Sequence, residues 1–181
     1  EWIQYYTALP FDPFKWRTCK LIISWDLNYK EGGGSYAVGV VLAKHENSFY
    51  LLDIYREKPS FMTLCEEVER MSKKYPNASV LIEEKANGQA ILSALKKKVP
   101  RMIGINPEES KEERLHAISP IFEAKEFLFP SNHPLTKRMV AEVTEFPHSE
   151  NDDIPDAISQ GLNHFSEMKG LTHLRAMTKW Y

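Results

Sequence analysis

The sequence is poor in cysteine, and it contains neither a long hydrophobic run nor an excess of positive charge. Its 181 residues include two cysteines, Cys19 and Cys65, which lie in apolar surroundings without metal-ligand spacing. We therefore expect two buried thiols and no disulfide framework. The longest apolar stretches have the length of a strand, and no basic segment followed by an apolar core opens the chain. These absences argue against a transmembrane helix and a signal peptide, so we expect no contact with a membrane.

The charge balance excludes a protein that binds nucleic acid through a large excess of positive charge. The formal net charge is −2, so the chain does not hold nucleic acid by bulk charge alone, and any polyanion must be bound locally. The phosphate-binding pattern Gly-x-x-x-x-Gly-Lys-Ser/Thr is also absent, so we expect no ATP hydrolysis. Hydrophobic residues make up 43% of the chain, which is enough to build the core of one domain of ordinary size.

The hydrophobic pattern predicts three consecutive strands, followed by alternating helices and strands. The predicted strands cover residues 19–25, 36–43, 48–55, 79–82, 101–105 and 127–129. The predicted helices cover residues 61–75, 88–98, a stretch from 111 onward, 134–143 and 153–167. A glycine-rich turn at 30–35 follows the first strand, and Ser110 with Glu113 matches a capping box at a helix start.

This order resembles the layout of the ribonuclease H-like fold, an α/β architecture. We expect a mixed central sheet that combines an antiparallel three-strand meander with parallel strands, and helices on both faces. In that topology the first and fourth strands are parallel neighbours. Asp26 and Glu83 would then lie side by side, and the last helix would bring Asp153 to the same place.

Acidic residues stand where two predicted strands end and where the last helix begins. They are Asp26 after the first strand, Glu83 and Glu84 after the fourth, and Asp152, Asp153 and Asp156 at the helix. Removing a carboxylate from water costs several kcal/mol unless a partner compensates its charge, so such residues are either solvated or neutralised by cations. Three such places in one domain favour hard, oxygen-preferring cations, and Mg²⁺ and Mn²⁺ are the natural candidates.

Such a set of acids suits phosphodiester hydrolysis, in which two divalent ions about 3.5 to 4 Å apart activate water and neutralise the leaving oxygen. We predict that Asp26 bridges two ions, that Glu83 binds one and that Asp153 binds the other. Asp156 lies one helical turn from Asp153 and can share the second ion, and Asp152 is a substitute ligand.

Glu84 competes with Glu83 for its role. Successive strand residues point to opposite faces of the sheet, so only one of the two can face the site, and we prefer Glu83.

Ordinary explanations exist for each of these residues. A single Asp after a strand is usually a solvated loop residue, and two Asp residues at a helix start follow the common N-terminal charge preference. Asp53 is predicted to face solvent, and His148 is predicted to be a loop histidine rather than a phosphate ligand. Lys111 and Arg114 share one face of a helix, from which they could contact a nucleic-acid backbone.

Four stretches resemble the C-terminal nuclease domain of phage terminase large subunits, within the ribonuclease H-like and RuvC-like superfamily. The resemblance covers roughly residues 20–165. The matching stretches are Ser24-Trp25-Asp26, Leu81-Ile82-Glu83-Glu84-Lys85-Ala86-Asn87-Gly88, Ser110-Lys111-Glu112-Glu113-Arg114 and Asn151-Asp152-Asp153-Ile154-Pro155-Asp156-Ala157. Family members often carry a His next to the Asp pair, whereas here other residues follow His148.

The resemblance implies a viral DNA-packaging nuclease in the host cytoplasm, with two Mg²⁺ or Mn²⁺ ions held at Asp26, Glu83 or Glu84, and Asp153 with Asp152 or Asp156. It implies cleavage of concatemeric double-stranded DNA without strong sequence specificity, and we assign Lys85, Lys111 and Arg114 to DNA contact. The implied partners are an upstream ATPase motor domain, a small terminase subunit and a portal. Residues 1–18 would be an extension from the motor, 19–169 the nuclease and 170–181 a tail.

Three other functions are compatible with the same sequence. A Holliday-junction resolvase or an RNA–DNA hybrid nuclease of the same fold would use similar acids, and a hybrid nuclease must contact 2′-hydroxyl groups. A noncatalytic docking module would carry acids that only solubilise the strand ends.

Overall fold

A mixed β-sheet forms the centre of the molecule. The computed structural model describes residues 1–15, 17–27, 36–85, 87–146, 148–149 and 151–177, so the predicted turn at 30–35 lies outside the described residues. In this part of the chain the sheet has seven strands in the order β1-β7-β4-β3-β2-β5-β6. The strands are β1 (Gln4–Tyr6), β2 (Lys20–Asp26), β3 (Ala37–His45), β4 (Ser48–Glu57), β5 (Ser79–Glu83), β6 (Met102–Ile105) and β7 (Phe127–Pro130).

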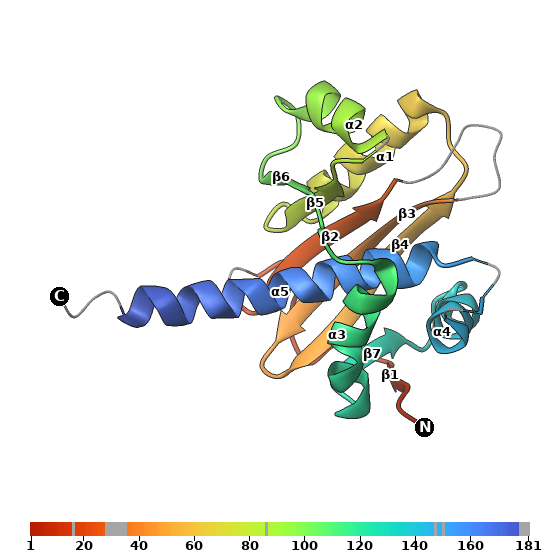
Figure 1. Ribbon diagram of the computed structural model, residues 1–181, viewed down its shortest axis with the longest axis vertical. Helices are drawn as coiled ribbons and strands as arrows, with labels where there is room; N and C mark the ends of the chain where they lie inside the picture. Colours follow the sequence, from red (N-terminus) through yellow and green to blue (C-terminus); the bar gives the residue numbers. More distant parts are fainter. Residues whose placement is uncertain (16, 28–35, 86, 147, 150, 178–181) are drawn as a thin grey trace.

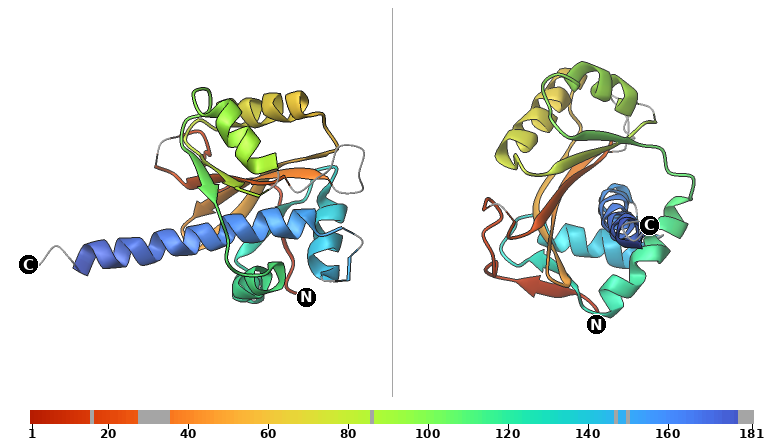
Figure 2. Two further views of the ribbon diagram at one scale, coloured as in Figure 1. Left: turned by 45° about the horizontal axis from the view of Figure 1, so that its top comes forward. Right: turned by 90° about the vertical axis from the view of Figure 1, so that its left-hand side faces the viewer.

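Helices cover both faces of this sheet (Figure 1). They are α1 (Phe61–Lys74), α2 (Asn87–Leu95), α3 (Lys111–Glu123), α4 (Thr136–Glu145) and α5 (Asp153–Met177). The views in Figure 2 place α1 and α2 on one side, and α3, α4 and α5 on the other. Helix α5 lies across β2 and β3, and its far end extends past the sheet (Figure 1). Although α5 has 25 residues, no described helix is both long and apolar enough to cross a bilayer.

The register of the strands places two candidate acids side by side at the carboxyl ends of two neighbouring strands. β2 pairs with β3 in antiparallel fashion and with β5 in parallel fashion, and Trp25 is opposite Ile82 in the parallel pair. Asp26 and Glu83 are the next residues of these two neighbouring strands. Both carboxylates therefore lie at the carboxyl ends of adjacent parallel strands.

The alternation of β2 decides which face these acids occupy. Ile23 and Trp25 belong to the core under α1 and α2, whereas Ile22 belongs to the core under α5. Because side chains alternate along a strand, Ser24 and Asp26 point to the α5 face with Ile22. Leu81 of β5 also packs in the α5 core, so Glu83, two residues on, points to that face as well.

The predicted fold class is confirmed, including the antiparallel meander of β2, β3 and β4 and the parallel strands beside it. The capping box of Ser110 and Glu113 is present at the start of α3. The short edge strand β1 was not predicted, although it pairs in parallel with β7. Helix α5 begins at the predicted Asp153 and continues ten residues beyond the predicted end at 167.

Candidate metal centre

The candidate acids are removed from solvent on the α5 side of the sheet. Asp26, Glu83, Asp153 and Asp156 each expose 5% of their surface or less. The first two close β2 and β5, and the last two lie in the first turn of α5. Buried carboxylates need compensation by cations, because their desolvation costs several kcal/mol each.

Lys111 supplies part of this compensation. It is the first residue of α3, and the capping box at Ser110 fixes the start of this helix. Its ammonium group forms an ion pair with Asp156 and another with Asp152, at 3.1 Å. The charge of Asp26 also acts on it, so the ammonium lies among acids from β2 and α5.

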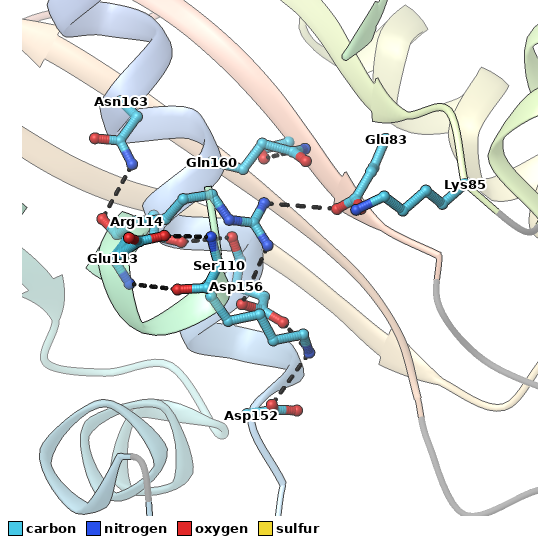
Figure 3. Close-up of polar contacts among 12 residues, drawn as sticks. Glu83, Lys85, Ser110, Glu113, Arg114, Asp152, Asp156, Gln160 and Asn163 are labelled. Atoms are coloured by element: carbon cyan, nitrogen blue, oxygen red, sulfur yellow. Dashed lines mark hydrogen bonds and ion pairs between the residues drawn. The ribbon is translucent and has the colours of Figure 1, made fainter. Parts of the chain in front are cut away.

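Arg114 connects the α5 acids to β5. It lies three residues after Lys111 on α3 and is buried. Its two terminal nitrogens point in different directions, one to Glu83 at 3.5 Å and one to Asp156 at 3.8 Å (Figure 3). The backbone carbonyl of Arg114 accepts a hydrogen bond from Asn163 of α5 at 3.0 Å, which ties α3 to α5 beside the site. One guanidinium thus bridges acids from two distant parts of the sequence.

The two glutamates at the end of β5 have different surroundings. Glu83 is buried and faces Arg114, whereas Glu84 is exposed and its side chain lies against Gly104 of β6. Lys85 is exposed and forms an ion pair with Glu83 at 3.2 Å (Figure 3). This arrangement favours Glu83 over Glu84 as a ligand at the α5 face.

A second buried network supports Asp153. Its carboxylate accepts a hydrogen bond from the backbone N–H of Tyr36 at 3.3 Å. The guanidinium of Arg56 stacks on the Tyr36 ring at 3.5 Å from its centre, and the same guanidinium donates to Glu142 of α4 at 3.0 Å. The backbone of Ile154 in turn hydrogen-bonds Glu142. The start of α5 is therefore held from β4 and α4 together.

Burial changes the protonation of the α5 acids. It raises the pKa of Asp156 to about 6, although Lys111 and Arg114 oppose the rise. Burial also raises the pKa of Asp153, while the N–H of Tyr36 lowers it. For Lys111, burial lowers the pKa, but the contacts with Asp156 and Asp152 raise it overall, so the ammonium stays charged.

The donor set fits hard divalent cations in its chemistry, since it consists of carboxylate oxygens. Among the side chains that the structure describes, no three His, Cys, Asp or Glu residues converge on one point that could hold an ion. Instead, Lys111 and Arg114 stand between the acids. Divalent ions at this centre would therefore compete with these two side chains for the carboxylates.

Gly88 allows Glu83 to occupy its position. A Cβ atom at Gly88 would lie 1.7 Å from the backbone oxygen of Glu83, so any larger residue must displace the end of β5 or the start of α2. We expect Gly88→Ala to lower the free energy of unfolding by about 1 to 3 kcal/mol. It should also weaken binding of Mn²⁺ by displacing Glu83. Urea unfolding and titration calorimetry with Mn²⁺ measure the two effects.

Gln89→Ala is the matched control for this variant, because Gln89 is the next residue of α2 and is exposed. It should leave both quantities unchanged. A Gly88→Ala protein with the stability and Mn²⁺ affinity of the unmodified chain would show that the close approach of Gly88 to the Glu83 backbone does not position Glu83.

Other predicted residues lie away from the acids. Asp53 was predicted to face solvent, which is wrong: it binds Lys74 of α1 at 2.7 Å and accepts a hydrogen bond from Tyr75, because helix α1 covers that face of β4. Cys65 is buried as predicted, but Cys19 is only half-buried, and both are free thiols. His148 is exposed and lies between α4 and α5.

Gln160 belongs to the site but was not predicted. Its amide donates to the Ser24 hydroxyl at 2.9 Å and to the Trp25 carbonyl at 3.3 Å, so it fixes α5 against β2 just below Asp26. A signal existed in the sequence, since Gln160 lies one helical turn after Asp156. No helical spacing in the sequence links Arg56 to Glu142, because β4 and α4 are far apart in the chain.

Comparison with known proteins identifies the family. The family model that describes the terminase RNaseH-like domain matches residues 23–165 of this chain. The chain belongs to this family. The match spans β2 to α5 and contains every candidate metal ligand described above. No curated protein sequence matches the chain.

Solved terminase nucleases have the same fold. The magnesium-bound large terminase nuclease of thermophilic phage G20c superposes with a TM-score of 0.68 at 14% identity, covering 88% of this chain and 92% of that one. The manganese-bound g2p nuclease domain of bacteriophage SPP1 gives 0.60 at 17% identity, with 91% and 97% covered. The human cytomegalovirus terminase nuclease domain, soaked with Mn, gives 0.66 at 10% identity, with 89% of each chain covered.

A longer relative is also similar. The large terminase of another thermophilic bacteriophage superposes with a TM-score of 0.63 at 14% identity, covering 86% of this chain and 41% of that one. This chain therefore matches less than half of that protein.

Proposed function

We propose that this terminase RNaseH-like domain is a metal-dependent endonuclease that cuts concatemeric double-stranded DNA during viral genome packaging. The observation that carries the proposal is that Lys111 and Arg114 bind buried acids of β5 and α5, with Asp26 of β2 close enough for its charge to act on Lys111. Related nucleases with bound Mg and Mn add support for divalent metals at such a cluster.

The proposed ligands follow from the placement of the acids. Asp26, Glu83 and Asp153, with Asp156 or Asp152, would hold two Mg²⁺ or Mn²⁺ ions, and Asp26 would be the ligand shared by both. When bound, the ions would activate water and neutralise the leaving oxygen.

Lys111 and Arg114 would have a second role. With divalent cations compensating the carboxylates, these two side chains would no longer be needed for that compensation, and their charges would be available to the DNA phosphates. Lys85 is exposed beside Glu83 and provides a third contact at the same end of the sheet. The contacts are to phosphate and not to bases, so we expect cutting with little sequence preference.

The domain would act with an upstream ATPase motor, a small terminase subunit and a portal in the host cytoplasm. We expect weak and salt-sensitive cutting by the isolated domain, since the formal charge of −2 provides no bulk attraction to DNA.

A cleavage assay tests this function. The protein is incubated with supercoiled plasmid, linear duplex, a four-way junction and an RNA–DNA hybrid, each with Mg²⁺, Mn²⁺ or EDTA. We expect nicking and linearisation of plasmid with Mn²⁺ or Mg²⁺ and none with EDTA. Preferred cutting of the junction or the hybrid would assign the domain to a resolvase or a hybrid nuclease instead. Inactivity on all four substrates would favour a docking module.

A further inference from the structure

A basic cavity lies at the end of the sheet opposite the metal centre. It has a volume of about 500 Å³ and is bounded by the starts of β2 and β5, the end of β3 and the segment before β2. Five of its described lining residues are Lys or Arg, and one is acidic. They are Lys15, Arg17, Lys20, Lys44, Arg101 and Glu46. The cavity thus concentrates positive charge in a chain whose formal net charge is −2.

The sheet brings two of these charges together. Lys20 of β2 is directly opposite Lys44 of β3 in the antiparallel register. Like charges in opposite positions disfavour strand pairing, so an anion near both ammonium groups would reduce their mutual repulsion. The Lys44 ammonium also lies 5.2 Å from the centre of the Phe49 ring. Lys20 is also exposed at its position, which leaves its ammonium accessible.

The backbone around the cavity has an unusual conformation. Arg17, Glu46 and Arg101 have positive φ angles of 69°, 52° and 56°. Such angles are uncommon for residues other than glycine, and here three of them line one cavity. One nitrogen of Arg101 donates to the carbonyl of Asn77 at 2.9 Å, and a guanidinium has further N–H donors to offer a ligand.

From this geometry we infer that the basic cavity binds the phosphate backbone of duplex DNA, as a second contact separate from the metal centre. The inference rests on the proposed function, because that function makes duplex DNA the polyanion the domain meets. Several cations spread over a cavity of this size suit successive phosphates better than one small anion.

The separation of the two sites is shorter than one turn of duplex DNA. Lys20 and Asp26 are the first and last residues of β2 and point to the same face, so about 20 Å separates them at about 3.3 Å per residue. Helix α5 runs the same way, with Asp153 at the metal centre and Met168 at the cavity. One turn of B-DNA is about 34 Å long and exceeds this separation.

DNA binding without divalent ions tests the cavity. Anisotropy of a labelled duplex of about 30 base pairs is measured in EDTA over a series of NaCl concentrations. The triple variant Lys15→Ala, Arg17→Ala, Lys20→Ala should bind at least about tenfold more weakly near 0.1 M salt. The slope of log K against log salt should fall by about 2 to 3, since each phosphate contact contributes about 0.9.

A matched control removes the same charge elsewhere. Lys97, Lys125 and Lys137 are exposed and do not line the cavity, so their replacement by Ala should leave affinity and slope nearly unchanged. A second cavity variant, Lys44→Gln with Arg101→Gln, guards against misfolding of the first and should also weaken binding. Equal effects of cavity and control variants, or no effect of either cavity variant, would overturn the inference.

Cleavage kinetics separate this inference from the proposed function. With Mn²⁺, the cavity variants should raise KM for duplex DNA at an unchanged kcat, because the altered residues lie far from the acids. If the unmodified domain cuts DNA and the cavity variants keep its KM, only the cavity assignment fails. If the cavity governs DNA binding but no cutting occurs with any metal, only the proposed function fails.

Discussion

Replacement of Asp26 by Asn should abolish metal-dependent nicking of plasmid, with a loss of at least about a hundredfold. The amide keeps the shape of the carboxylate but removes the negative charge that the bridging role requires. Thermal stability should be retained or increase, because one charge is removed from a cluster of buried acids. Plasmid nicking with Mn²⁺ and thermal unfolding in EDTA measure the two expectations.

Asp53→Asn is the control for this variant. Asp53 also sits on a strand, but it faces α1 and binds Lys74, away from the α5 side of the sheet. This variant should nick DNA at the rate of the unmodified chain. Unchanged nicking by Asp26→Asn would remove Asp26 from the catalytic assignment.

Replacement of Arg114 by Leu should destabilise the metal-free protein strongly. The Arg114 side chain is buried and contacts Glu83 and Asp156, so its loss leaves two buried carboxylates without this partner. Breaking a buried ion pair from one side costs about 3 to 5 kcal/mol. For a domain of this size, that corresponds to a fall in Tm of about 10 °C in EDTA.

Excess Mn²⁺ should restore part of this loss, since ions that bind only the folded state stabilise it by mass action. Arg138→Leu is the control: Arg138 is mostly exposed and pairs with Glu142 one turn away, so its removal should cost less than about 1 kcal/mol. A Tm for Arg114→Leu equal to that of the unmodified chain would show that the guanidinium does not compensate the acids.

The positions of the acids could be predicted because they depend on local rules. Each follows an apolar run or opens a helix, and strand alternation allows only one of Glu83 and Glu84 to face the site. The parallel pairing of β2 and β5 then follows from the order of elements, which is a property of the whole topology.

The partners of these acids could not be predicted in the same way. Arg114 was assigned to DNA contact, and its ion pairs with Glu83 and Asp156 were not predicted. That placement depends on how α3 packs against α5, and helix periodicity does not encode the packing of distant elements. The pairing of Arg56 with Glu142 joins β4 to α4, and it also depends on the packing of elements that are distant in the chain. The edge strand β1 was missed because three residues are too few for a clear alternation.

The acids of the candidate metal centre are far apart in the sequence, at Asp26, Glu83 and Asp153. During synthesis on the ribosome, the first two emerge long before the third. A nascent or truncated polypeptide that lacks α5 therefore has no complete set of ligands. Under the proposed function, DNA cleavage would therefore require that α5 has been synthesised.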